Sequence, residues 1–232
     1  MPETTPAISR LGDSALLLHW SIGALDVRNA QVHRVAAALQ QVRPAWLQDL
    51  VPAYASLALI IDSAFDAVTL DTAEQWLMDN LPAALAAQHT NRNQRLIEIP
   101  VCYEPPFAPD LSDIASACGM PIEEVITRHC TPIYRVAMLG FAPGFPYLMG
   151  LDPALAMARL PTPRTRVAAG SVGIGGNQTG IYPCLSAGGW RLLGRTPLTL
   201  FDPLRDPPSL LLAGDELRFF AVDRACFDAP SI

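Results

Sequence analysis

The 232-residue chain contains no lysine, because all sixteen of its basic residues are arginine. This absence excludes a P-loop, which holds phosphate with a lysine, and a Schiff-base mechanism, which needs a lysine amine. The serine–serine–lysine machinery of the amidase-signature hydrolases is excluded for the same reason. Any anion that binds this chain must therefore be held by arginines or by backbone N–H groups.

Other features are scarce as well. The net charge is −6 and the isoelectric point is about 5.1, so the chain lacks the basic surface of nucleic-acid-binding proteins and we predict no nucleic-acid partner. The five cysteines form no CxxC pair and the four histidines are scattered, so we predict no metal and no prosthetic group. With no apolar run near 18 residues and no signal-peptide pattern, we expect a cytoplasmic protein without a membrane partner.

The first 90 residues predict a small α+β domain. Apolar runs at 15–20 and 56–61 are typical of short buried strands. Asp26 is placed to cap a helix that ends at 43–44, and a second helix is expected over 66–85. Apolar side chains recur every three or four residues in both helices, at Val32, Val35, Ala36, Leu39, Leu70, Ala73, Leu77, Leu81 and Ala84.

A polar run at 88–94 is the best linker candidate, and residues 91–232 predict a second, mainly β domain. It opens with an alternating strand at 96–103 and two short helices at 110–118 and 121–129, the second with Pro121 in its first turn. Glycine and proline then separate short strands. We expect these strands at 171–175, 180–183, 190–193, 198–201, 210–212 and 217–222. The fold class is therefore α+β.

Chemistry-bearing residues gather between 139 and 203, where glycine, proline and aromatic residues alternate. Arg164 and Arg166 are two positions apart, so on a strand they would point to the same side and could bind a carboxylate or a phosphate. The alternative is that both are solvated and paired with acids such as Asp152 or Asp202. Ser171 is a poor nucleophile candidate, because Ala169 stands where a GxSxG elbow needs glycine.

Four runs in this region, GFAPGFPYL, PRTRVAAGSVGIGG, QTGIYP and GGWRLLGRTPL, resemble the 5-oxoprolinase B subunit family. That family is also named allophanate hydrolase subunit 1 and inhibitor of the sporulation histidine kinase. The runs VPAYASL, IPVCY and AGDELRF extend the resemblance over nearly the whole chain. Ala168 and Ala187 depart from it, because proline is expected at both positions. The resemblance implies a cyclophilin-like β-barrel for residues 91–232.

The resemblance also implies a function. The chain would be a non-autonomous subunit of an ATP-dependent hydrolase, 5-oxoprolinase, which opens 5-oxo-L-proline to L-glutamate with ATP as co-substrate. Its main interface would be with the C subunit, which would share the active site, and the A subunit would complete the complex. Two alternatives stay open. One is a module that inhibits a sensor histidine kinase, and the other is a carboxyltransferase-like component acting on urea or allophanate.

The candidate site residues follow from the residue types and from the resemblance. Arg164, Arg166 and Arg195 would stabilise transferring phosphate and substrate carboxylate. Predicted substrate- or partner-binding residues are Phe141, Pro143, Gly144, Phe145, Tyr147, Gly170, Ser171, Gln178, Thr179, Tyr182 and Trp190. For Thr179 ordinary turn chemistry is an open alternative, and for Trp190 a core anchor. The aromatic loop would mix core rings with exposed ones, and His129 would be a packing histidine.

Overall fold

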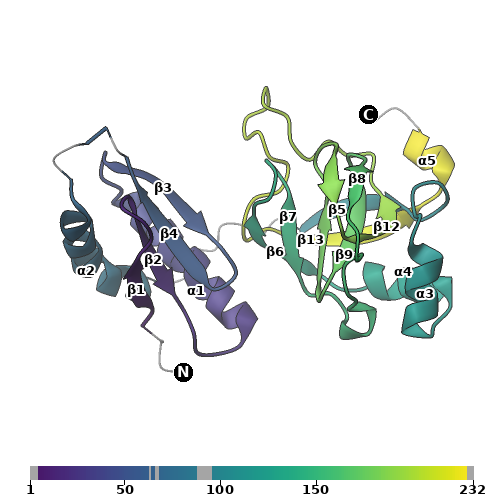
Figure 1. Ribbon diagram of the computed structural model, residues 1–232, viewed down its shortest axis with the longest axis horizontal. Coiled ribbons are helices and arrows are strands. Elements are labelled where there is room, and N and C mark those ends of the chain that lie inside the picture. Colours follow the sequence, from purple (N-terminus) through teal and green to yellow (C-terminus); the bar gives the residue numbers. More distant parts are fainter. Residues whose placement is uncertain (1–4, 63, 66–67, 88–95, 229–232) are drawn as a thin grey trace. The chain divides into compact units, whose positions relative to one another are not determined.

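The computed structural model describes residues 5–62, 64–65, 68–87 and 96–228. Contacts divide the chain into two compact units, residues 1–92 and 93–232, next to the boundary expected at residue 90 (Figure 1). Each unit has its own hydrophobic core. The predicted linker at 88–94 lies entirely outside the described residues.

The first unit is a four-stranded antiparallel sheet with two helices on one face (Figure 1). The sheet order is β1-β2-β4-β3, and helices α1 and α2 contact each other above it. The elements are β1 (Ala7–Arg10), β2 (Ala15–His19), α1 (Leu25–Gln41), β3 (Leu47–Pro52), β4 (Ser56–Ile61) and α2 (Leu70–Ala86).

Apolar periodicity predicted both helices of this unit, and their buried faces are the predicted ones. The predicted cap at Asp26 is wrong: α1 begins one residue earlier, and its N-cap residue, Ala24, makes no side-chain cap bond. The helix α2 begins at Leu70, where the Thr69 hydroxyl accepts a hydrogen bond from the Thr72 N–H at 3.2 Å. The predicted start at 66–67 lies outside the described residues.

The second unit is built around a closed barrel of seven strands in the order β10-β7-β6-β13-β5-β12-β9 (Figure 1). The pairing of β13 with β5 is parallel, and the other pairs are antiparallel. The barrel confirms the predicted α+β fold class. Its strands are β5 (Leu96–Cys102), β6 (Tyr134–Leu139), β7 (Pro146–Met149), β9 (Ser171–Gly175), β10 (Gln178–Ile181), β12 (Arg191–Arg195) and β13 (Glu216–Val222).

Shorter elements surround the barrel. The helices α3 (Leu111–Cys118) and α4 (Ile122–Cys130) pack against each other and against β12 and β13. Pro121 is the N-cap residue of α4 and not, as predicted, part of its first turn. A separate two-stranded sheet joins β8 (Arg164–Val167) to β11 (Ser186–Gly188). The remaining elements are a 3-10 turn (Pro153–Leu155) and α5 (Arg224–Asp228).

Two predicted strands are wrong. Residues 198–201 and 210–212 form no strands, although a bridge joins Phe201 to Ser209 and the Leu210 N–H donates to the Leu200 carbonyl at 2.8 Å. The segment between them contains three prolines, at 203, 207 and 208. Proline has no N–H to donate, so it interrupts the ladder that the apolar runs suggested.

A series of hydrogen bonds runs through the barrel interior. The Thr179 hydroxyl donates to the Gly173 carbonyl at 3.0 Å, so its oxygen accepts from Nε2–H of His129 at 3.2 Å. The other ring nitrogen, Nδ1, then accepts from the Tyr103 hydroxyl at 2.7 Å. All three side chains are buried, and each polar atom of the three side chains has a partner. The prediction that His129 is a packing histidine is confirmed.

Burial without a neighbouring carboxylate lowers the pKa of His129 from 6.5 to about 3. The folded barrel therefore cannot take up the proton that His129 binds in the unfolded chain below pH 6.5. Because the unfolded chain binds more protons in this range, the free energy of unfolding rises with pH between about 3 and 6.5. Above pH 6.5 His129 is neutral in both states and no longer makes stability depend on pH.

Acidification from pH 6 to 4 should therefore destabilise the barrel by about 1.4 kcal/mol per pH unit through His129 alone. Urea denaturation at a series of pH values measures the free energy of unfolding and its slope against pH. Pulsed hydrogen exchange at the backbone amides of β5 and β13 shows how much of the barrel is unfolded at each urea concentration. The His129→Gln variant removes the titrating group but keeps a hydrogen-bonding side chain, so its slope should be smaller by that amount. Equal slopes in the two proteins would contradict the assignment.

Candidate functional site

A strained turn holds one aromatic ring in solvent. The Ala142 N–H donates to the Gly140 carbonyl at 2.8 Å, which closes a three-residue γ-turn around Phe141. Phe141 has a φ of +67°, a backbone angle that side chains other than glycine rarely adopt, and its side chain is 62% exposed. Strain of this kind, on the order of 1–3 kcal/mol, persists only where the surrounding structure enforces it.

The turn at residues 142–145 holds the strained loop in place. The Phe145 N–H donates to the Ala142 carbonyl at 2.9 Å, across an exposed Pro143 and a Gly144 whose φ is +79°. Proline and then glycine at these two positions are typical of a type II turn. A Cβ on Gly144 would lie 2.8 Å from the Cβ of Phe201, so only glycine fits. The loop is therefore pinned on the body of the second unit.

Phe141 is the exposed member of an aromatic cluster, formed by Phe141, Phe145, Tyr147, Tyr182 and Trp190. The Phe145 ring lies 4.9–5.5 Å from each of the other four ring centroids, in edge or tilted arrangements. Phe145, Tyr182 and Trp190 are buried, and Tyr147 is half-buried. The predicted mixture of core and exposed rings is confirmed, and Trp190 is a core anchor.

Two arginines lie beside the aromatic cluster. The Arg159 guanidinium carbon is 5.7 Å from the centre of the Trp190 ring. Burial raises the pKa of Tyr182, and a hydrogen bond to the Trp190 backbone together with the positive charges of Arg159 and Arg164 opposes this shift. Sequence reasoning missed Arg159, because it lies between the recognised runs and has no spacing relation to the other arginines.

Arg164 is held by a buried carboxylate. Its Nη2 donates to Oδ1 of Asp110 at 2.6 Å, and the other oxygen of Asp110 accepts from the Leu192 N–H at 2.6 Å. Asp110 is buried, whereas the Arg164 side chain is 30% exposed. The alternative pairing of Arg164 with Asp152 or Asp202 is wrong, since Asp152 pairs with Arg128 at 2.9 Å. Asp110 thus fixes the direction of the Arg164 guanidinium.

Arg166 occupies the second position of the predicted pair. Both arginines are in β8, two residues apart, and the register of β8 against β11 shifts between Arg164 and Val167, so strand alternation does not fix their side chains to one side. Arg166 is exposed and makes no hydrogen bond or ion pair with any residue that the structure describes. The strand therefore presents one arginine fixed by a carboxylate and one that is available to an anion.

Arg195 lines a cavity to which neither Arg164 nor Arg166 contributes. Its Nε donates to the Ala169 carbonyl at 2.7 Å, and its guanidinium carbon lies 5.8 Å and 5.7 Å from the rings of Phe107 and Phe227. These two rings are themselves in contact, with centroids 4.1 Å apart. The cavity has a volume of about 500 Å³. Its lining comprises Ala169, Gly170, Pro183, Arg195, Thr196, Pro197, Leu198, Thr199, Phe227 and Asp228.

Gly170 connects the cavity of Arg195 to the aromatic cluster. Its N–H donates to the Tyr182 carbonyl at 2.7 Å, and its carbonyl accepts from the Thr196 N–H at 2.9 Å. Its φ is +81°, and a Cβ there would lie 2.2 Å from the Thr196 carbonyl oxygen. This position therefore requires glycine, because any side chain would force the two segments apart.

The remaining predicted residues lie in β9 and β10. Ser171 is buried in β9, and Gln178 is half-buried at the start of β10. Thr179 is fully buried and bonded to His129, so the structure places it in the barrel interior and not on a cleft surface. Ala168 and Ala187, where the resemblance leads us to expect proline, are both exposed.

Metal and membrane features were sought in the described ranges. No three histidine, cysteine, aspartate or glutamate side chains there lie close enough together to hold a metal ion. None of the helices in those ranges combines the length and the apolar character that a membrane crossing requires.

Comparison with known proteins assigns the chain to a family. Residues 6–211 match the family described as carboxyltransferase domain, subdomain C and D. The B subunit of 5-oxoprolinase from Bacillus subtilis (strain 168) is 38% identical over 235 residues, covering 96% of this chain and 95% of that protein. The chain belongs to the 5-oxoprolinase B subunit family. The family to which the sequence runs pointed is confirmed.

Further relatives agree over parts of their length. The B subunit of 5-oxoprolinase from Escherichia coli O157:H7 is 52% identical over 125 residues, 54% of this chain and 57% of that protein. The solved structure of TTHA0988 is 36% identical with a TM-score of 0.80, and it covers 95% of this chain. This chain spans only 41% of TTHA0988. The solved structure of the K. lactis urea amidolyase is 20% identical, with a TM-score of 0.74. The match covers 98% of this chain and 16% of the amidolyase chain, and at this identity it supports the fold alone.

The close approach at Gly170 gives a direct test of the site's framework. Gly170→Ala should destabilise the second unit by at least about 3 kcal/mol, because it adds both backbone strain and a clash with Thr196. Gly176→Ala is the matched control: Gly176 also has a positive φ, of +69°, but its Cβ would meet nothing within 4 Å. The control should cost about 1 kcal/mol. Urea denaturation measures the free energy of unfolding of both variants. An equal loss of stability in the two would refute the role of the close contact between Gly170 and Thr196.

Proposed function

We propose that this chain is the B subunit of an ATP-dependent 5-oxoprolinase, with an active site that the C subunit helps to form. Its membership of the 5-oxoprolinase B subunit family supports the proposal, as does the name of a relative that matches nearly its full length. The observation that carries it is the arginine pair on β8, which lies beside a buried aromatic cluster and offers one unpaired guanidinium.

The arginines supply charge and not proton transfer. His129 is the only histidine between residues 93 and 232, and it is sealed inside the barrel in its neutral form. The chain has no lysine, and arginine keeps its proton at any physiological pH. A nucleophile–base pair built on histidine or lysine is thus absent from this unit, and we expect the partner to provide the missing groups.

The chemistry of the substrate fits such a division. A lactam is a poor electrophile, and transfer of the γ-phosphoryl group of ATP to its oxygen would activate the ring carbon. Water would then add to that carbon, and the C–N bond would break to leave an acyl phosphate. A second water would release phosphate and L-glutamate. The substrate carboxylate and the transferring phosphoryl group are both anions, which suits arginine.

Each arginine takes a distinct part in this proposal. Arg166 would bind the carboxylate or the phosphoryl group directly, since it has no partner among the described residues. Arg164, which Asp110 orients, would hold a second anionic oxygen. Arg195 would act from its separate cavity, where the rings of Phe107 and Phe227 flank it. The exposed ring of Phe141 would contact the C subunit.

The test is ATP-dependent loss of 5-oxoproline by the chain co-purified with its candidate A and C subunits. Arg166→Ala should lower turnover by at least about 100-fold, as the loss of a charge contact to the transition state does. The three proteins should still co-purify, because Arg166 holds no part of the fold together. Arg218→Ala is the control: Arg218 is also exposed and pairs with Glu98 on the outside of the barrel, so turnover should not change.

Three outcomes would contradict the proposal. Full activity of the Arg166→Ala complex would remove the arginine from the reaction. A stable complex that hydrolyses no 5-oxoproline would favour a carboxyltransferase-like reaction on urea or allophanate. A chain that binds neither candidate partner, but blocks autophosphorylation of a sensor histidine kinase, would be a regulatory module.

A further inference from the structure

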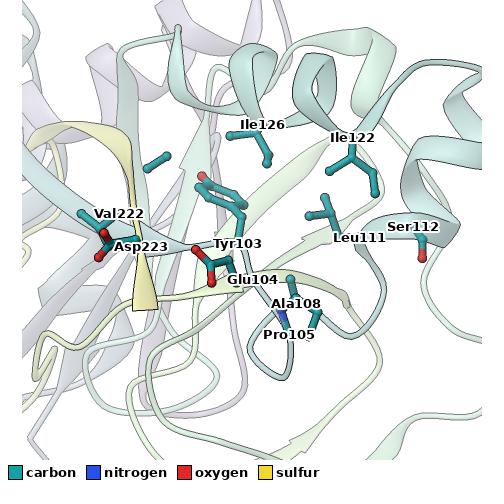
Figure 2. A pocket seen from close by; sticks show the side chains of 11 residues that line it. Tyr103, Glu104, Pro105, Ala108, Leu111, Ser112, Ile122, Ile126, Val222 and Asp223 are labelled. Carbon is teal, nitrogen blue, oxygen red and sulfur yellow. The ribbon is translucent and has the colours of Figure 1, made fainter. Parts of the chain in front are cut away.

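A second cavity lies away from the arginines, between the helix pair and the ends of two barrel strands (Figure 2). Its volume is about 520 Å³, within the range of small-molecule sites. We call it the helix-pair pocket. It is lined by Tyr103, Glu104, Pro105, Ala108, Leu111, Ser112, Ile122, Ile126, Ala221, Val222 and Asp223.

The walls of the helix-pair pocket are mostly apolar. Leu111 and Ile122 are the first residues of α3 and α4, and Ile126 follows one turn later in α4. Ile122 remains 38% exposed, although it is a large apolar side chain at the pocket. The ring of Tyr103 forms part of the wall, and its hydroxyl is occupied by His129 in the interior.

One side of the pocket is acidic. Figure 2 shows the Asp223 carboxylate to the left of the Tyr103 ring, the Glu104 carboxylate below the ring, and the side chains of Leu111 and Ile122 to its right. Both acids are exposed, and none of the eleven lining residues is arginine, lysine or histidine. Two negative charges thus adjoin an apolar surface without a cation in the lining to neutralise them.

A backbone N–H binds the Asp223 carboxylate. The Asp223 carboxylate accepts from the Cys226 N–H at 2.8 Å, and this bond holds the pKa of Asp223 below its usual value. Burial raises the pKa of Cys102, a hydrogen bond with the Glu104 backbone opposes this shift, and the charges of Glu104 and Asp223 add to it. Arg224 follows Asp223 in the chain but pairs with Asp228 at 3.5 Å.

We propose that the helix-pair pocket binds a small organic cation, with an apolar body against α3 and α4 and an ammonium group at Glu104 and Asp223. This site is distinct from the proposed 5-oxoprolinase site, because 5-oxoproline and ATP are anions that the two carboxylates would repel. It is independent of whether the chain forms an oxoprolinase.

Three probes with one apolar body test the proposal on the full chain: benzylamine, benzyl alcohol and benzoate. Methyl NMR of Ile122 and Ile126 locates binding and measures each Kd. Benzylamine should bind with a Kd on the order of 1–10 mM, as expected for a ligand of this size. Benzyl alcohol should bind at least about 5-fold more weakly, and benzoate should cause no saturable shift.

Variants separate the charge from the pocket. The double variant Glu104→Gln with Asp223→Asn keeps the shape of both side chains and should bring benzylamine down to the affinity of benzyl alcohol. Glu98→Gln removes an exposed carboxylate outside the lining and should change nothing. Ala221→Trp should fill the pocket and abolish the shifts for all probes. Equal affinity for the three probes, or benzylamine binding that survives the double variant, would overturn the proposal.

Discussion

A single buried carboxylate, that of Asp110, joins the parts of the second unit on which the candidate site depends. Its two oxygens bind the Leu192 N–H of barrel strand β12 and the Arg164 side chain of β8, and its backbone N–H donates to the Leu192 carbonyl at 3.0 Å. Its own carbonyl accepts the Ile114 N–H in the first turn of α3. A buried charge is costly unless every oxygen is bonded. Helix, barrel and arginine strand are therefore held in one arrangement.

Glycine contacts extend that arrangement to the rest of the site. Gly170 ties Tyr182 to Thr196 through its backbone, and Gly188 lies so close to the Tyr182 ring that a Cβ would be 2.3 Å from its hydroxyl. These contacts fix the position of Tyr182, a buried member of the aromatic cluster. Phe141 differs from these buried rings, because it is exposed and its backbone is strained.

Helices and strands that depend on neighbouring residues could be predicted from the sequence. The apolar faces of α1 and α2, and the strand β9 at residues 171–175, could be predicted from the sequence because periodicity alone specifies them. The bond between Asp110 and Arg164 could not, since 54 residues separate the two. The predicted strands at 198–201 and 210–212 were wrong because apolar content outweighed the prolines between them.

The same limit applies to the site. Glycine and proline marked the loop at residues 140–145 and the contact at Gly170, because both depend on backbone angles that few residues adopt. Nothing in the spacing placed Arg159 over Trp190 or Thr179 inside the barrel, since only the closed sheet brings those residues together. The net charge of −6 likewise does not reveal that arginines gather on β8 while carboxylates border the helix-pair pocket. Only the folded chain separates these positive and negative groups.

The central claim is that the surface carrying Phe141 and Arg166 is where a second protein of the complex completes the site. Hydrogen exchange of the chain alone and in complex with the C subunit tests it most directly. The account predicts slower exchange at residues 140–147 and 164–167 in the complex, with the four-stranded sheet of the first unit serving as an internal comparison. A stable complex that leaves exchange at 140–147 and 164–167 unchanged would contradict it.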